Sequence, residues 1–246
     1  MIRKVLFFVL FTTLSCAVMA QGETSPTQKK KGRPDIPGTF AIDLGFNLPI
    51  KKEDFNTNFF GSRTIDFYYF YDLQIGASQF SIHPGIGLGL ERYKFSNDRT
   101  LGYVAGPNSP YDTLRMVSSP FSSLKKSLLI TNYIDIPFEV RFTANPNDPN
   151  RSFKVSAGFK FGVLYDSFTK QKYRENSETK KLKDKQNYNL NPIRYGVLLR
   201  LGFGNFSAYG YYSISPLFKD GKGPNDGEGV PETINTWTVG ITLATF

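Results

Sequence analysis

Residues 128–143 read LLITNYIDIPFEVRFT, and the order of side chains in this stretch predicts the fold class. Large apolar residues alternate with polar ones, and a period of two is typical of a β-strand with one apolar and one polar face. The stretch is longer than the roughly 9–11 residues that a tilted strand needs to cross the hydrocarbon of a membrane. The apolar face comprises Ile130, Ile134, Ile136, Phe138, Val140 and Phe142, and the polar face Thr131, Tyr133, Asp135, Glu139 and Arg141.

The same alternation recurs in seven other stretches, so the chain contains eight candidate strands. Eight is the smallest even number of strands among bacterial outer-membrane barrels. After residue 20 no stretch approaches about 18 continuous apolar residues, which excludes a transmembrane helix. The other predicted strands span about 39–47, 64–75, 80–94, 153–166, 193–203, 206–215 and 233–246.

The connections between these strands alternate in length. Compact turns are expected at 76–79, 145–150 and 204–205. Outer-membrane barrels have short periplasmic turns and long external loops. We therefore predict an all-β fold, a transmembrane antiparallel up-and-down β-barrel of about eight strands in the bacterial outer membrane. The long connections, expected on the external side, are 48–63, 95–127, 167–192 and 216–232.

The polar face of the strands is expected to line the lumen. It is rich in Gly, Ser and Thr, and the interior of an eight-stranded barrel is just wide enough to be filled by side chains. The large residues lie on the other face, where lipid has room for them. The structural alternative is a soluble lipocalin-like carrier, which would bury the apolar face and carry a hydrophobic ligand.

Charged residues on the inward face are expected to pair, because an isolated buried charge is costly. We interpret them as a salt-bridged plug, and a small ion-conducting pore is the alternative. The predicted lumen charge network consists of Asp66, Glu91, Asp135, Glu139, Arg141, Lys160, Arg194 and Arg200, with Asp43, Asp72 and Lys154 on the same face.

The N-terminal residues have the parts of a secretory signal peptide. Two basic residues precede a short apolar run, and Val18-Met19-Ala20 supplies small residues before a cleavage site. The single cysteine, Cys16, would leave with the signal, so no disulfide is expected. The predicted organisation is a signal peptide over 1–20, a flexible periplasmic lead-in over 21–38 and the barrel over 39–246.

The formal net charge is +9, and much of it lies in the connection 167–192. A basic exported protein is expected to meet acidic glycolipid headgroups or an acidic partner rather than nucleic acid. Lys and Arg on the outer surface would bind glycolipid phosphates well, but we favour the other interpretation, a solvated and disordered loop. The external basic loop is expected to comprise Lys170, Lys172, Arg174, Lys180, Lys181, Lys183 and Lys185.

Enzymatic chemistry has one candidate centre, the only histidine, His83. Ser81 and Glu91 lie on the same inward face, but Glu91 is several steps away along the strand, so the spacing indicates no triad. We expect a hydrogen-bonded lumen histidine, with no catalytic residue, no metal-ligand cluster, no P-loop and no cofactor.

Several segments resemble the PorT-like outer-membrane β-barrel proteins that are typical of the Bacteroidota. Residues 132–142 are similar to the "Y-x-[ED]-I-P-[LF]" strand of that family, and 153–164 follow where its next strand is placed. Residues 209–218 are similar to its penultimate strand and last external loop, and 237–243 to its closing strand. Phe246 fits the terminal aromatic residue of the family but lies out of phase with Trp237 and Leu243. The resemblance implies a small barrel with a link to type IX protein secretion.

These observations favour a non-enzymatic outer-membrane barrel that acts as an anchor, a scaffold or a secretion-associated component. A lipid-modifying enzyme centred on His83 and a small pore are the alternatives. The expected partners are outer-membrane lipids with their glycolipid phosphates, the barrel-assembly machinery during biogenesis, and an envelope protein.

Overall fold

A computed structural model describes residues 38–50, 55–105, 113–121, 123–225, 231 and 233–245. The expected signal peptide and the lead-in up to residue 37 lie outside the described residues, as does Phe246. The described residues between 38 and 245 form one compact unit, which is the barrel. No helix in the described part of the chain is long and apolar enough to cross a membrane.

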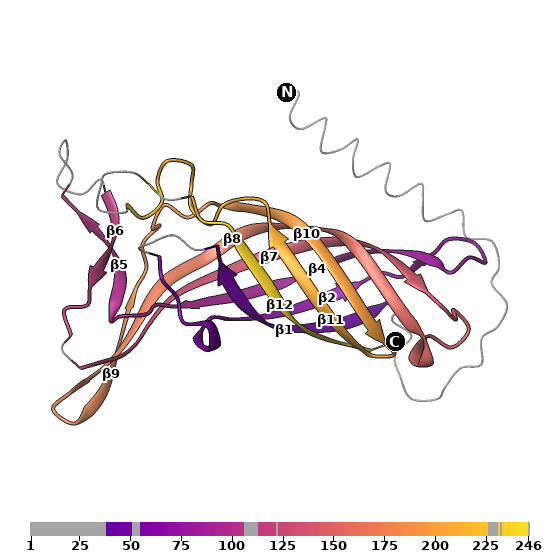
Figure 1. Cartoon of the computed structure of the whole chain (residues 1–246), viewed down its shortest axis with the longest axis horizontal. Coiled ribbons are helices and arrows are strands. Elements are labelled where there is room, and N and C mark those ends of the chain that lie inside the picture. Colours follow the sequence, from indigo (N-terminus) through magenta and orange to yellow (C-terminus); the bar gives the residue numbers. More distant parts are fainter. Residues whose placement is uncertain are drawn as a thin grey trace. The chain divides into compact units, whose positions relative to one another are not determined.

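Eight long antiparallel strands close into a ring, which confirms the predicted fold class (Figure 1). The ring order is β1-β2-β4-β7-β8-β10-β11-β12, and it closes where β12 pairs with β1. The strands of the ring are β1 (Thr39–Pro49), β2 (Arg63–Phe70), β4 (Phe80–Lys94), β7 (Leu124–Thr143), β8 (Phe153–Glu175), β10 (Ile193–Phe203), β11 (Phe206–Ser213) and β12 (Thr236–Thr245). The remaining elements are β3 (Leu73–Gln74), β5 (Arg99–Val104), β6 (Thr113–Ser118), β9 (Glu178–Asp184) and the 3-10 turns η2 (Phe59–Gly61) and η3 (Pro149–Arg151).

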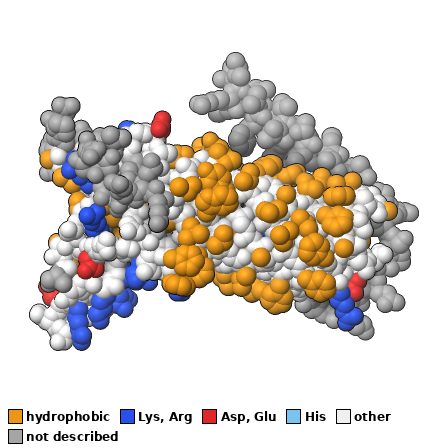
Figure 2. All heavy atoms as spheres, viewed as in Figure 1, with side chains coloured by type: hydrophobic (Ala, Val, Ile, Leu, Met, Phe, Trp, Pro, Cys, Tyr) orange, Lys and Arg blue, Asp and Glu red, His pale blue; other side chains and the backbone are white. Residues whose placement is uncertain are grey.

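Large apolar side chains cover the outside of this ring, as the alternation predicts. On β7, Ile136 is 52% exposed whereas its neighbour Asp135 is completely buried. Figure 2 shows the same arrangement as a broad band of hydrophobic side chains across the face of the barrel that is in view. A soluble barrel would have the opposite distribution, with apolar residues inside. The carrier alternative is therefore wrong, and the outer face is suited to lipid.

The predicted strand 64–75 is divided into β2 and β3 by a two-residue break. The break lies opposite Pro84 of β4, which has no N–H to donate to the ladder. Tyr71 still donates its own N–H to the Pro84 carbonyl at 2.8 Å. The registers on both sides of the break are continuous, since Phe70 pairs with Gly85 and Leu73 with Ile82.

The predicted external basic loop is wrong as a loop, because most of it is paired strand. β8 runs through to Glu175 and turns back into β9. Asn176 and Ser177 form the two-residue turn with φ of 49° and 66°. Such a turn usually carries Gly at one of these positions. Because Ser177 stands where Gly is common, the sequence carries no signal for a turn here.

A β-bulge decides which way the side chains of the β8 extension point. Asn132 of β7 pairs with Asp166 and Tyr133 pairs with Leu164, so Tyr165 has no partner. An extra residue on one strand reverses the alternation beyond it. As a result, odd-numbered residues of β8 such as Val163 face outward before the bulge, and even-numbered residues face outward after it.

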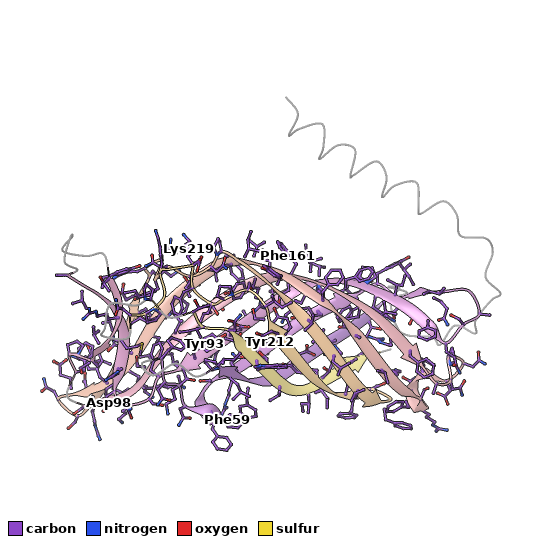
Figure 3. The ribbon with its side chains drawn as sticks, turned by 45° about the horizontal axis from the view of Figure 1, so that its top comes forward. Phe59, Tyr93, Asp98, Phe161, Tyr212 and Lys219 are labelled. Carbon is purple, nitrogen blue, oxygen red and sulfur yellow. The ribbon has the colours of Figure 1, made fainter. Side chains whose placement is uncertain are left out.

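The largest cluster of buried apolar residues in the described chain lies at the external end, above the lumen rather than in the barrel wall. Tyr93 of β4, which is labelled in Figure 3, and Leu129 of β7 point inward, and both are completely buried. Residues from the long connections pack onto them and cover the lumen. The other members are Phe55, Phe95, Leu101, Leu114, Tyr188, Leu190, Leu217, Phe218 and Ile234.

Ile136→Arg is expected to lower the free energy of unfolding by about 2–4 kcal/mol, because it places a charge deep in the hydrocarbon. Urea titration of the barrel folded into liposomes measures this cost. Asn132→Arg is the matched control on the same strand and the same outward face, and should cost about 0–1 kcal/mol near the interface. Equal costs at the two positions would contradict the assigned depth.

Candidate functional site

Arg194 of β10 is the centre of the first of two ion-pair clusters inside the barrel. Its guanidinium reaches Asp135 of β7 through two bonds, Nη2 to Oδ2 at 2.6 Å and Nε to Oδ1 at 3.1 Å. Nη1 donates to Glu91 of β4. The same cluster contains Lys160 of β8, whose Nζ lies 3.4 Å from Asp66 and 3.9 Å from Asp135. Bidentate arginine–carboxylate pairs are among the strongest and most directional ion pairs.

Tyrosines complete the coordination of this cluster. Tyr68 lies 3.0 Å from Asp135 and 3.1 Å from Asp66 through its hydroxyl, and Tyr93 donates to Glu91 at 2.8 Å. Rings cover the cations as well: the Arg194 guanidinium lies 3.9 Å from the centre of Tyr133, and Lys160 Nζ 4.0 Å from that of Tyr211. Cation–π contacts of this kind are strongest where water is excluded.

Two glycines make room for the Arg194–Asp135 pair. A Cβ at Gly89 would lie 2.2 Å from Arg194 Nη2, and a Cβ at Gly162 would lie 2.3 Å from Asp135 Oδ1. Neither position can therefore take a larger residue while the pair remains. This packing explains why Gly89 of β4 and Gly162 of β8 are glycines.

Arg200 of β10 forms the second cluster, nearer the periplasmic end. Its Nη1 and Nη2 bind the two oxygens of Asp43 at 2.7 and 2.8 Å, and its Nε binds Glu139 Oε1 at 2.9 Å. Nη1 also donates to Thr242, which donates to Asp43 at 2.8 Å. Arg141 lies on the same inner face and donates through Nε to Ser156 at 3.2 Å.

The two clusters leave little open space where they fill the lumen. Beside Arg141, Lys154 and Arg200 lies a cavity of about 20 Å³. A space of that size holds roughly one water molecule. The charges are nearly balanced, because six carboxylates line the lumen and its rim with five cations and His83: Asp43, Asp66, Asp72, Glu91, Asp135 and Glu139 against Arg141, Lys154, Lys160, Arg194 and Arg200.

A hydrogen-bonded chain crosses the periplasmic rim at His83. His83 Nε2 lies 2.7 Å from Ser81 Oγ, and His83 Nδ1 lies 2.5 Å from Asp72 Oδ1. Thr39 of β1 donates to the other oxygen of Asp72 at 2.7 Å. Since an ionised carboxylate only accepts, Nδ1 carries a proton, and in the neutral imidazole Nε2 then accepts from the Ser81 hydroxyl.

Sequence analysis missed Asp72 as the acid of this chain, because it considered only Glu91 on the same strand as His83. Glu91 instead belongs to the Arg194 cluster. The signal that identifies Asp72 is register: the compact turn 76–79 places it directly opposite His83 across β3 and β4. Ser81 is 9% exposed, so a molecule from the periplasm would have restricted access to it.

The described residues contain no group of three or more His, Cys, Asp or Glu side chains that could hold a metal ion. The predicted basic residues lie together at the external end of the barrel. Lys170, Lys172 and Arg174 are on β8, Lys180, Lys181 and Lys183 are on β9, and Lys185 follows β9. Two of them have acidic partners, Lys180 with Glu175 at 2.7 Å and Lys185 with Asp166 at 3.0 Å.

A comparison with protein families agrees with this architecture. The family described as "Outer membrane protein beta-barrel domain" matches residues 20–219. No curated protein matches the chain. The crystal structure of Ail, the attachment invasion locus protein of Yersinia pestis, in complex with the heparin analogue sucrose octasulfate is similar over 85% of this chain and 100% of that chain, at 15% identity and a TM-score of 0.33. A likeness at that score carries no argument about this chain.

Arg194→Met is expected to lower the free energy of unfolding by about 3–5 kcal/mol, because it leaves Asp135 and Glu91 buried with one cation fewer. The urea midpoint in liposomes, together with heat-modifiable gel mobility, measures the loss. Lys180→Met is the control: it removes an exposed pair and should leave the midpoint unchanged. An unchanged midpoint for Arg194→Met would contradict the view that this cluster stabilises the barrel.

Proposed function

The chain belongs to the outer membrane protein β-barrel family, and we propose that in the bacterial outer membrane it acts as a closed, non-enzymatic anchor or scaffold. The observation that carries this proposal is the filled lumen. Arg194 and Arg200 bind carboxylates from strands that are not their neighbours, so side chains occupy the path that an open channel would need. The apolar cluster around Tyr93 and Leu129 covers the external end of the same path.

The external extension supports the scaffold role. β8 and β9 continue well beyond the lipid-facing band, and β5 and β6 form a separate hairpin at the same end. A rigid membrane part with extended strands outside is suited to presenting a surface to a partner. The PorT-like strand around Ile136 and Pro137 suggests that such a partner belongs to type IX secretion.

The proposed partners follow from this location. They are the outer-membrane lipids with their glycolipid phosphates, the barrel-assembly machinery during biogenesis, and an envelope protein. Co-purification of the tagged protein from its native outer membrane tests the last of these directly. A secretion component recovered with it would support the secretion link, and a barrel recovered alone after mild crosslinking would argue against a stable partner.

In planar bilayers the purified barrel is expected to show negligible conductance, because paired side chains fill its lumen. A channel-forming outer-membrane porin inserted under the same conditions is the positive control. A large and stable open conductance would overturn the closed-barrel proposal in favour of the small pore.

The Ser81–His83–Asp72 chain favours a second candidate function, an acyl hydrolase. Ser81 Oγ would attack an ester carbonyl while its proton passes to His83 Nε2, and His83 would then protonate the leaving alcohol. Water would then attack the acyl-Ser81 ester while His83 Nε2 accepts its proton. His83 would return this proton to Ser81 Oγ as the acid leaves. Arg141, the cross-strand neighbour of Ser81, would supply positive charge near the oxyanion. The burial of Ser81 places this candidate second.

A fluorophosphonate probe is expected to leave Ser81 unlabelled in the folded barrel, because the hydroxyl is buried. Intact-mass analysis measures the labelling, and His83→Gln is the matched variant. Labelling of Ser81 that disappears in His83→Gln would promote the hydrolase over the anchor. The lipid A mass spectrum of cells carrying His83→Gln should likewise match that of the wild type.

A further inference from the structure

Eight basic side chains share the outward face of the barrel just beyond the lipid-facing band. They come from five strands that are adjacent in the sheet, β2, β4, β7, β8 and β9. Figure 2 shows Lys and Arg side chains gathered at this end of the barrel. We call this surface the cationic face, and its members are Arg63, Arg92, Lys94, Lys126, Lys170, Lys172, Lys181 and Lys183.

The strand register places like charges directly opposite one another on the cationic face. Arg63 pairs with Arg92, Lys170 pairs with Lys183, and Lys172 pairs with Lys181. Like charges directly opposite on one face of a sheet destabilise the strand pair. Three such pairs on one surface therefore call for a bound anion that offsets the repulsion.

The protein does not supply that anion from the part of the chain that the structure describes. Lys180 and Lys185 nearby do bind carboxylates, yet no described carboxylate lies within ion-pair distance of any member of the cationic face. Burial, together with neighbouring cations, lowers the pKa of Lys126 and of Lys170. A phosphate bound between the strands would relieve this crowding.

The depth of the cationic face matches the headgroup layer of the outer leaflet. Ile65 and Leu90 form the last apolar pair of β2 and β4, and Arg63–Arg92 is the next outward pair, about 7 Å further along the strands. Phe59 and Phe60 are exposed beside it, and Arg63 Nε donates to the Phe60 carbonyl at 2.8 Å. An apolar pair below the cations, with exposed aromatic rings beside them, fits the boundary between hydrocarbon and headgroups.

Apolar residues support the cations from within the same face. Leu128 lies between Lys94 and Lys170 in the register, and Ile130 lies between Arg92 and Phe168. Although both point outward, Leu128 is only 6% exposed and Ile130 only 9%. The basic side chains are thus held over an apolar floor, which limits their freedom before any ligand binds.

A cavity lies next to the cationic face, at the end that is farther from the lipid-facing band. Lys94 and Lys126 line a cavity of about 350 Å³ together with Asn58, Lys125 and Asp98. Sites for small molecules span roughly 300–1,000 Å³, so the cavity is large enough for a phosphorylated sugar. Three of the five named lining groups are cationic, and Asn58 adds an amide.

We propose that the cationic face is a binding site for the phosphate groups of the outer-leaflet glycolipid, with Lys94, Lys126 and Lys170 at its centre. The inference deepens the proposed contact with glycolipid phosphates and rests on it. The acyl chains lie against the apolar band below, while lysines of three strands bind the phosphate at the headgroup level. Lys180 and Lys185 do not belong to the site, because each is already paired with a carboxylate of the protein, Glu175 and Asp166 respectively.

The test compares the wild type with a Lys94→Gln, Lys126→Gln, Lys170→Gln triple variant in phosphatidylcholine nanodiscs. Native outer-leaflet glycolipid is added intact or chemically dephosphorylated, and acyl-chain analysis measures the amount retained per barrel. The triple variant is expected to bind intact glycolipid roughly tenfold more weakly, because charge-assisted hydrogen bonds are lost at a partly screened surface. Lys180→Gln, Lys219→Gln, Lys222→Gln is the charge-matched control and should bind as the wild type does.

Three results would overturn the inference. These are equal retention of dephosphorylated glycolipid by the wild type, an equal loss in the control variant, and preferential binding of a soluble sulfated polysaccharide, which would make the ligand a free polyanion. Heat-modifiable gel mobility shows that each variant is folded. Conductance is measured on the same samples, so a closed barrel without glycolipid binding separates failure of this inference from failure of the anchor proposal.

Discussion

Charged side chains that are buried away from water must form ion pairs, and this requirement determines the arrangement of the barrel interior. Arg194 binds Glu91, which is 103 residues away in sequence, and Arg200 binds Asp43, which is 157 residues away. Neither pair joins neighbouring strands of the ring, so the bonds span the lumen. Removing one member of such a pair leaves an uncompensated buried charge. The network therefore favours one registration of the eight strands over slipped alternatives.

The same requirement separates the inside of the barrel from its outside. Inside, every charged side chain of the Arg194 cluster has an ion-pair partner in the protein, and Gly89 and Gly162 leave the space that the Arg194–Asp135 pair occupies. Outside, the cationic face carries eight basic side chains but has no described acidic partner. An interior closed to water satisfies its charges internally, whereas a surface at the membrane boundary can use a lipid phosphate. Because of this contrast, we expect a ligand at the external surface rather than in the lumen.

The alternation of apolar and polar residues predicted much of the fold. β4 and β10 have the bounds that alternation predicts. β10 has one apolar and one polar face over its full length, whereas β4 keeps that pattern only up to Leu90 and then places Arg92 and Lys94 on its outward face. β9 was missed because its residues are polar on both faces, and only pairing with β8 defines it. Asp72 was missed for a related reason: its partner His83 lies on another strand, and a single-strand pattern holds no information about cross-strand neighbours.

By itself the sequence determined that this chain forms an antiparallel barrel with lipid outside and charges inside, since a period of two assigns every residue of a strand to a face. It also determined which charged residues enter the lumen. Only the tertiary structure decided which of them meet, because that depends on register around a closed ring. The unpaired Tyr165 is the clearest case. This one bulge reverses the alternation in β8 and turns Lys170 and Lys172 outward beside Lys94 and Lys126, an effect of strand pairing that no local pattern of side chains encodes.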